Sequence, residues 1–310
     1  MSTTSSLEEG TGWALVMTTG VSAFDALVAA LDEQAVRIEE MLDRDVLSIC
    51  GPIEGNLDYR VRQALEAVPP KKRREGLAVY LETPGGLIQL VERMVTSMRF
   101  HYQSVIFVVP NQAMSAGTVL ALSGDDIFMD YYACLGPVDP QVYRQNVGLV
   151  PAAASISLWD KLEQKAKRFI ETGDVEDRLT EFDFAVFGRL NAEEIFVMKE
   201  QAELTTTLLT TWLCTYKFKN WTVTESNGTP VTMGMKRERA LEIARMLNDH
   251  NEWHSHGRGI SAQVLREKLK LRISELESGS ELQATSRKYS STLANALTSG
   301  NNFVHSTWYH

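Results

Sequence analysis

The sequence predicts an α/β protein with a mostly parallel sheet, followed by a helical C-terminal region. Apolar runs of strand length alternate with segments of helical spacing over residues 46–129. Beyond residue 150 the spacing is almost entirely helical. Alternation of strands and helices is typical of a parallel sheet covered by helices. In such sheets, binding and catalytic sites form in loops at the carboxyl ends of the strands.

The individual elements follow from hydrophobic periodicity and from turn residues. Apolar residues at helical spacing predict a first, amphipathic helix over residues 22–42. Short runs rich in Val, Ile and Leu predict buried strands at 46–53, 76–81, 104–109 and 126–129. Further helices are predicted at 56–68, 87–100, 118–123, 153–170, 191–216, 236–249 and 261–277.

These elements suggest a division of the chain into four parts. An N-terminal tail and the amphipathic helix occupy residues 1–44, and the α/β core occupies residues 45–220. A helical C-terminal region follows at 221–285. Residues 286–310 are rich in Ser, Thr and Asn, show little pattern, and are predicted to form a tail.

Composition excludes several classes of function. The 310 residues carry a net charge of −9, which argues against a nucleic-acid-binding surface. No run of about 18 uncharged apolar residues exists, so no membrane span is expected, and no secretory leader is evident. The three cysteines are isolated in sequence, which favours reduced thiols and a cytoplasmic location.

One serine stands where nucleophilic chemistry would be favoured. Ser115 follows the strand at 104–109 in a turn of small residues and precedes the helix at 118–123. Backbone N–H groups at the start of a helix are unpaired and point outward. A serine in this place could attack a carbonyl while adjacent N–H groups receive the developing oxyanion. An ordinary tight turn would also need small residues, so Ser115 alone does not decide between the two readings.

Four motifs follow one another along the chain. They are Thr83-Pro84-Gly85-Gly86, Ala113-Met114-Ser115-Ala116-Gly117, Leu135-Gly136-Pro137-Val138-Asp139-Pro140-Gln141 and Ser255-His256-Gly257-Arg258. Together they resemble the ClpP/crotonase superfamily, and within it the serine dehydrogenase proteinase family, relatives of ClpP and of signal peptide peptidase A. The resemblance covers about residues 45–265 and implies a ClpP/crotonase-like core of repeated strand–helix units.

The resemblance also implies a role for each site residue. Ser115 would be the nucleophile, Asp139 would orient the histidine, and His256 would be the general base. Gly86 and Ala116 would offer the N–H groups of the oxyanion hole. The family implies an ATP-independent serine peptidase that acts on peptides or proteins, needs no cofactor or metal, and forms a homo-oligomer.

The choice of base leaves alternatives open. No histidine lies between Ser115 and Asp249, so the base must come from the late histidines, and His250 and His254 compete with His256. His101 precedes the serine strand and lies at its wrong end. A Ser–Lys dyad, as in signal peptide peptidase A, would instead use a lysine of the helix at 153–170. The candidates are Lys161, Lys165 and Lys167.

Two further alternatives concern the class of protein. The spacing of His250, His254 and His256 would suit a zinc site. A non-catalytic scaffold or binding protein with the same fold is also possible, with Ser115 incidental. Crotonase-like enzymes use an oxyanion hole without a serine nucleophile, so the serine at this turn speaks against a crotonase-like reaction.

Overall fold

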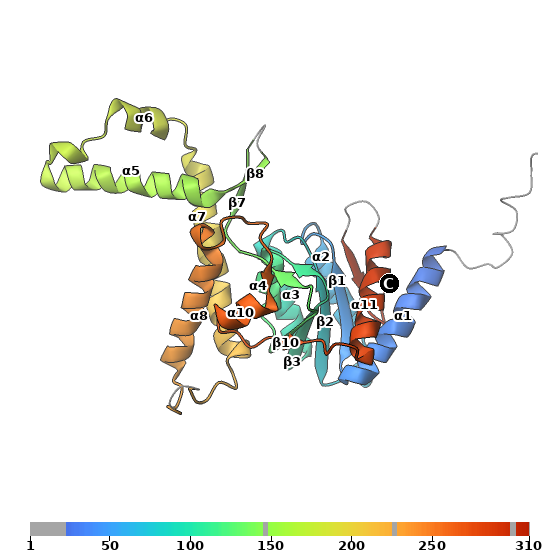
Figure 1. The fold of residues 1–310 in the computed structure, drawn as a ribbon. Helices are drawn as coiled ribbons and strands as arrows, with labels where there is room; N and C mark the ends of the chain where they lie inside the picture. The colour runs from blue at the N-terminus through green and yellow to red at the C-terminus, as the bar shows by residue number, and fades with distance from the viewer. Residues whose placement is uncertain (1–22, 145–147, 225–227, 298–301, 310) are drawn as a thin grey trace, which may run out of the picture.

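A six-stranded sheet forms the centre of the molecule in the computed structural model (Figure 1). The structure describes residues 23–144, 148–224, 228–297 and 302–309. The strand order is β10-β5-β3-β2-β1-β11, and all neighbours pair in parallel except β1 and β11. The strands are β1 (Asp45–Cys50), β2 (Gly76–Glu82), β3 (Ser104–Val109), β5 (Asp126–Met129), β10 (Ser274–Glu275) and β11 (Phe303–His305). The predicted α/β class is therefore confirmed.

Helices cover both faces of this sheet. On one face, α2 (Leu57–Ala67) and α3 (Ile88–His101) pack their apolar side chains against inward-facing residues of β1, β2 and β3. On the other face, α1 (Ala23–Leu42) and α11 (Glu281–Ala296) lie side by side (Figure 1). Burial on both faces explains why the central strands read as continuous apolar runs.

A helical extension leaves this body after residue 150. It contains α5 (Ala152–Thr172), α6 (Glu181–Phe187) and α7 (Ala192–Trp212), and α5 and α6 project away from the sheet (Figure 1). A π-helical turn, Leu213–Lys217, continues α7, and α8 (Met233–Asn248) packs back against it. A hairpin of β7 (Gln141–Arg144) and β8 (Gly148–Pro151) leads into α5. Among the described residues, no helix is both long and apolar enough to cross a bilayer.

A second, smaller sheet positions the site. It consists of β4 (Gln112–Ala113), β6 (Cys134–Leu135) and β9 (Ile260–Ser261), in the order β4-β6-β9. β4 and β6 are parallel, whereas β6 and β9 are antiparallel. Each strand has only two residues, which is too short for a recognisable hydrophobic alternation.

The C-terminal third differs from the sequence prediction in two places. The helix predicted at 261–277 ends early, because only α10 (Ala262–Glu267) is helical and β10 then joins the main sheet. The expected tail at 286–310 contains most of α11 and all of β11. Most of the predicted N-terminal tail lies outside the described residues. The division of the chain at residues 44, 220 and 285 stays a prediction.

Candidate active site

Three loops converge because the small sheet joins their strands. β4 immediately precedes the Ser115 turn, β6 leads into the loop that carries Asp139, and β9 follows the loop that carries His256. Ala113 pairs with Leu135, and Leu135 pairs with Ile260. Segments that are far apart in sequence are thereby held at one edge of the molecule.

Ser115 occupies a strained turn between β4 and α4 (Ala116–Ala121). Its backbone has φ 52° and ψ −118°, a region that non-glycine residues rarely adopt. Thr118 supports this turn: its buried hydroxyl donates to the Ala113 carbonyl oxygen at 2.8 Å and accepts the Gly136 N–H at 2.9 Å. Strain of this kind is retained where the surrounding structure fixes it, and it frequently marks a functional site.

The Pro-Gly-Gly turn passes directly beside Ser115. A Cβ atom on Gly85 would lie 2.7 Å from Ser115 Cβ, and a Cβ atom on Gly86 would lie 2.2 Å from the Ile53 carbonyl oxygen. Both glycines have positive φ, 103° and 146°. Only glycine fits these two positions, because a side chain would be both strained and blocked.

Two backbone N–H groups are available near the serine. Ile53 donates to the Gly85 carbonyl and accepts from the Leu87 N–H, so the intervening Gly86 N–H faces away from Ile53. Ala116 is the first residue of α4, where an N–H has no intrahelical acceptor. Gly86 and Ala116, to which the resemblance assigns the oxyanion hole, both line the cavity that contains Ser115.

The buried Asp139 carboxylate and the partly exposed His256 ring form a hydrogen-bonded pair. His256 Nδ1 donates to Asp139 Oδ1 at 2.8 Å, and the Asp139 side chain is 1% exposed. Gln141 Nε2 donates to the other oxygen, Oδ2, at 3.2 Å. A bond from Nδ1 to a carboxylate fixes the ring and leaves Nε2 as the acceptor. The loop itself is held to α8 by a hydrogen bond from Val138 N to the Leu247 carbonyl oxygen.

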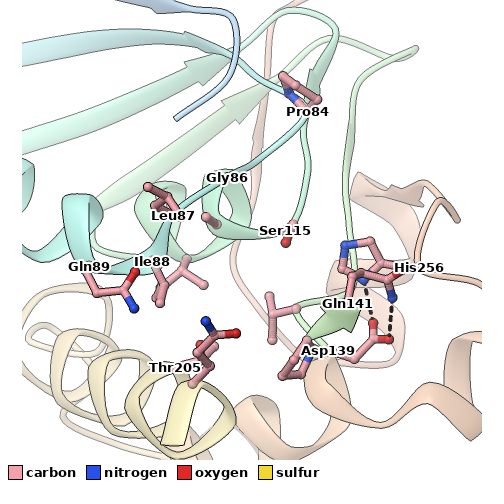
Figure 2. A pocket seen from close by; sticks show the side chains of 15 residues that line it. Pro84, Gly86, Leu87, Ile88, Gln89, Ser115, Asp139, Gln141, Thr205 and His256 are labelled. Carbon is pink, nitrogen blue, oxygen red and sulfur yellow. Dashed lines mark hydrogen bonds and ion pairs between the residues drawn. The ribbon is translucent and has the colours of Figure 1, made fainter. Parts of the chain in front are cut away.

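One cavity of about 370 Å³ brings these groups together (Figure 2). Figure 2 shows Ser115 across an open gap from the Asp139–His256 pair, with Gly86 on the opposite wall. Glutamine and threonine side chains from α3 and α7 complete the lining, together with Leu87, Ile88, Val119 and Val138. A cavity of this size fits a segment of a ligand.

No hydrogen bond joins Ser115 Oγ to His256 among the described residues. Bonds between catalytic groups often tighten only in the complex with substrate.

Cys134, on β6 of the small sheet, carries another nucleophilic side chain of this region. Burial raises the pKa of its thiol, which keeps the thiol protonated at neutral pH. Cys134 is therefore disfavoured as a rival nucleophile.

The alternative bases are placed differently from His256. Lys165 pairs with Asp183 at 2.7 Å and Lys167 pairs with Glu163 at 2.6 Å, both on the helical extension. Lys161 lines a second cavity, which Asp139 and Pro140 also line. The described residues that line the Ser115 cavity include no lysine.

The three late histidines do not converge on one point. His256 lines the Ser115 cavity, His250 faces Asp139 from another direction, and His254 is exposed. Within the described ranges, no group of three or more His, Cys, Asp or Glu side chains is arranged to hold a metal ion. The geometry therefore gives no support to the zinc alternative.

Three supporting residues were not assigned a role from the sequence. Gln141 lies in the motif that contains Asp139, and Thr118 lies three residues after Ser115, so both were close to a recognised signal. For His250 the sequence indicates only a rival base or a metal ligand. Its position beside Asp139 depends on the turn after α8, which no sequence pattern revealed.

The fold and this cavity define a ClpP-like α/β core. Residues 56–177, less than half of the chain, match the model of the ClpP-like SDH-type serine proteinases. The matched segment contains Gly86, Ser115, Ala116 and Asp139, but it ends before His256.

Curated relatives match over shorter segments. Two uncharacterized proteins of Methanocaldococcus jannaschii are 38% and 35% identical over 82 and 85 residues, which is 26% and 27% of this chain. The Clp protease proteolytic subunit of Lactococcus lactis subsp. cremoris is 28% identical over 93 residues, 30% of this chain. The chain spans only 28%, 27% and 47% of the lengths of these relatives.

Two solved structures resemble parts of the chain. Both are of the 1510-N membrane-bound stomatin-specific protease. One, in complex with a substrate peptide, is 26% identical, has a TM-score of 0.32, and covers 39% of this chain and 57% of its own. The other is 22% identical, has a TM-score of 0.32, and covers 49% and 82%.

Proposed function

We propose that this protein is an ATP-independent serine peptidase with a triad of Ser115, His256 and Asp139. The observation that carries the proposal is the 2.8 Å hydrogen bond between Asp139 and His256 on the wall of the cavity that also holds Ser115. The family match over residues 56–177 supports the reaction class.

The proposed reaction is acyl transfer. Ser115 Oγ attacks the peptide carbonyl carbon as its proton passes to His256 Nε2. The bond to the leaving nitrogen then breaks, and His256 returns the proton to that nitrogen. Water repeats the sequence on the acyl-enzyme and releases the acid. Asp139 holds the ring in the correct tautomer and stabilises its charged form.

The negative charge on the carbonyl oxygen needs donors that are already in place. In the proposal, the N–H groups of Gly86 and Ala116 supply them from a turn and a helix start that the fold holds rigid. Loss of one such donor typically slows a related reaction by about 10²–10³-fold.

A fluorophosphonate probe tests the nucleophile. We expect it to label the wild type at Ser115 and not to label Ser115→Ala. Retention of the probe by Ser115→Ala would refute Ser115 as the nucleophile. A wild type that no probe labels would favour the scaffold alternative.

The same probe separates the triad from the dyad. His256→Ala should label at least about 10³-fold more slowly than wild type. Lys161→Ala and Lys165→Ala should label at the wild-type rate, because these lysines lie outside the Ser115 cavity. The reverse pattern would establish a Ser–Lys dyad and overturn the triad.

The proposal extends to substrate, assembly and location. The family supports peptide or protein substrates, and the resemblance noted in the sequence supports a homo-oligomer. The free thiols of Cys50, Cys134 and Cys214 favour a reducing compartment, the cytoplasm. Light scattering coupled to size exclusion tests the assembly, and a mass near 34.7 kDa would refute it.

A further inference from the structure

The Asp139 carboxylate faces two imidazole rings. His256 Nδ1 lies 2.8 Å from Oδ1, and His250 Nδ1 lies 3.7 Å from Oδ2. Both histidines belong to the segment that follows α8, six residues apart. The Oδ2 atom otherwise accepts only the 3.2 Å bond from Gln141 Nε2 among the described residues.

His250 Nδ1 is a buried nitrogen without a hydrogen-bond partner in the described part of the chain. A buried polar atom without a hydrogen-bond partner lowers the stability of the fold by about 1–3 kcal/mol. An unpaired nitrogen in a folded protein therefore calls for an explanation. At 3.7 Å the contact with Asp139 is too long to be a hydrogen bond, but Oδ2 is the acceptor that Nδ1 faces. A carboxylate has room for about four donors.

The turn that carries His250 is well anchored. Asp249 caps the short helix α9 (His250–Trp253) by accepting the Asn251 N–H at 2.9 Å. Trp253 is buried, and its Nε1 donates to the Met246 carbonyl oxygen at 2.7 Å. His250 is therefore held beside Asp139 by the fold, and only a small ring movement separates it from a bond.

We propose that His250 is a positioning residue that acts on the base through Asp139. This proposal rests on the function proposed above. The uncharged ring donates Nδ1–H to Oδ2 and holds the carboxylate in line with His256.

The other charges near His250 are mostly neutralised by their own partners. On the same turn, Glu252 pairs with Lys268, and Asp249 caps α9. Across the neighbouring cavity, Asp160 of α5 pairs with Lys199 at 2.5 Å, and Lys161 lines the same cavity. Asp139 is the charged group within ion-pair distance of His250 in the described structure.

Three variants test the hydrogen bond. His250→Leu removes the donor, and His250→Gln keeps a donor without a charge. His254→Asn is the matched control: His254 lies on the same turn, is exposed, and has φ 62°, which asparagine tolerates. At about pH 8 we expect His250→Leu to label Ser115 about tenfold more slowly than wild type. His250→Gln should recover most of this loss, and His254→Asn should match wild type.

Recovery by glutamine separates positioning from a structural role. If His250 acted through packing alone, His250→Gln would label as slowly as His250→Leu, because both variants lose the imidazole ring. A His250→Gln protein that labels as slowly as His250→Leu would therefore overturn the proposal.

Nuclear magnetic resonance of the histidine rings gives a readout without activity. At a fixed pH near 8, the His256 Nδ1–H proton should exchange with solvent faster in His250→Leu than in wild type, because Asp139 is held less firmly. His250→Gln should restore the slow exchange. Equal exchange rates in wild type and His250→Leu would refute the positioning role. If wild type fails to label at Ser115, the peptidase proposal falls, and the resonance data still decide the role of His250.

Discussion

Asp139 and His256 are hydrogen-bonded at 2.8 Å although 117 residues separate them in the chain. The helical extension and α8 lie between them in sequence. The contact exists because β6 and β9 are neighbours in the small sheet and because Val138 is bonded to the end of α8. The proposed base, His256, therefore lies in a part of the chain outside the family match, which ends at residue 177.

The first prediction concerns Asp139→Asn. This variant keeps the shape of the side chain but removes the charge that fixes the His256 tautomer, so labelling of Ser115 should slow about 10³–10⁴-fold. Asp160→Asn is the matched control, because Asp160 lines the neighbouring cavity and does not contact His256. Labelling rates and thermal unfolding of both variants check this prediction. Equal rates in the two variants would remove Asp139 from the triad.

The second prediction compares two glycines. Both have positive φ, but a Cβ on Gly85 would lie 2.7 Å from Ser115 Cβ, whereas a Cβ on Gly55 would meet nothing within 4 Å. Gly55→Ala should therefore cost only the backbone strain, about 1–2 kcal/mol in the free energy of unfolding. Gly85→Ala should also displace the serine and slow labelling at least about 10²-fold.

Urea unfolding measures the backbone strain in Gly55→Ala and Gly85→Ala, and the labelling rate measures the displacement of Ser115. A folded Gly85→Ala that labels as fast as Gly55→Ala would show that the close approach to Ser115 is unimportant for the site.

The strands and helices that position Ser115 were predictable because their apolar patterns are strong. The strand at Ser104–Val109 and the strand at Asp126–Met129 were predicted with the bounds that the structure shows. By contrast, α11 was missed because its inward face is largely polar: Gln283 and Ser286 are buried beside Tyr289 and Leu293. Hydrogen bonds satisfy these polar groups, and such partners are not visible in a sequence.

The candidate site was predictable in part for a similar reason. Ser115 and the Pro-Gly-Gly turn lie at carboxyl ends of recognisable strands, so their proximity follows from the fold class. The position of His256 does not follow from the fold class. It depends on the pairing of β6 with β9, two strands of two residues each, in which Leu135 pairs with Ile260, 125 residues further along the chain. The role of His256 rested on the resemblance, and its catalytic function stays a prediction.

The third prediction concerns the docking of α11. The Arg287 guanidinium donates two hydrogen bonds to Asp130, at 2.5 and 2.9 Å, and these bonds hold the Asp130 pKa below its ordinary value of 3.8. Arg287→Gln should lower the free energy of unfolding at neutral pH, and by less than loss of a fully buried pair would, since Arg287 is half exposed. Arg37→Gln is the control. It breaks an exposed ion pair with Glu33 and should leave the free energy of unfolding almost unchanged.

The pH dependence has a definite sign. Because the folded protein binds the Asp130 proton more weakly than the unfolded chain does, this stabilisation is present above pH 3.8 and is lost as the pH falls further. Urea unfolding at several pH values measures the difference between Arg287→Gln and wild type. A difference that stays constant to below about pH 3 would contradict the assignment to Asp130.

The last prediction tests the buried polar chain that holds the C-terminus on the sheet. The Tyr289 hydroxyl accepts from Ser48 Oγ at 2.7 Å and lies 2.8 Å from His305 Nδ1, and all three side chains are fully buried. Tyr289→Phe leaves the Ser48 hydroxyl without this acceptor, which should lower the free energy of unfolding by about 1–3 kcal/mol. Tyr59→Phe is the control, because Tyr59 is exposed and its hydroxyl accepts a 3.3 Å bond from Gln63, its one hydrogen bond among the described residues. If Tyr289→Phe unfolds at the same urea concentration as Tyr59→Phe, the hydrogen bonds of this chain do not hold α11 and β11 in place, and apolar packing of Leu293 and Val304 must do so.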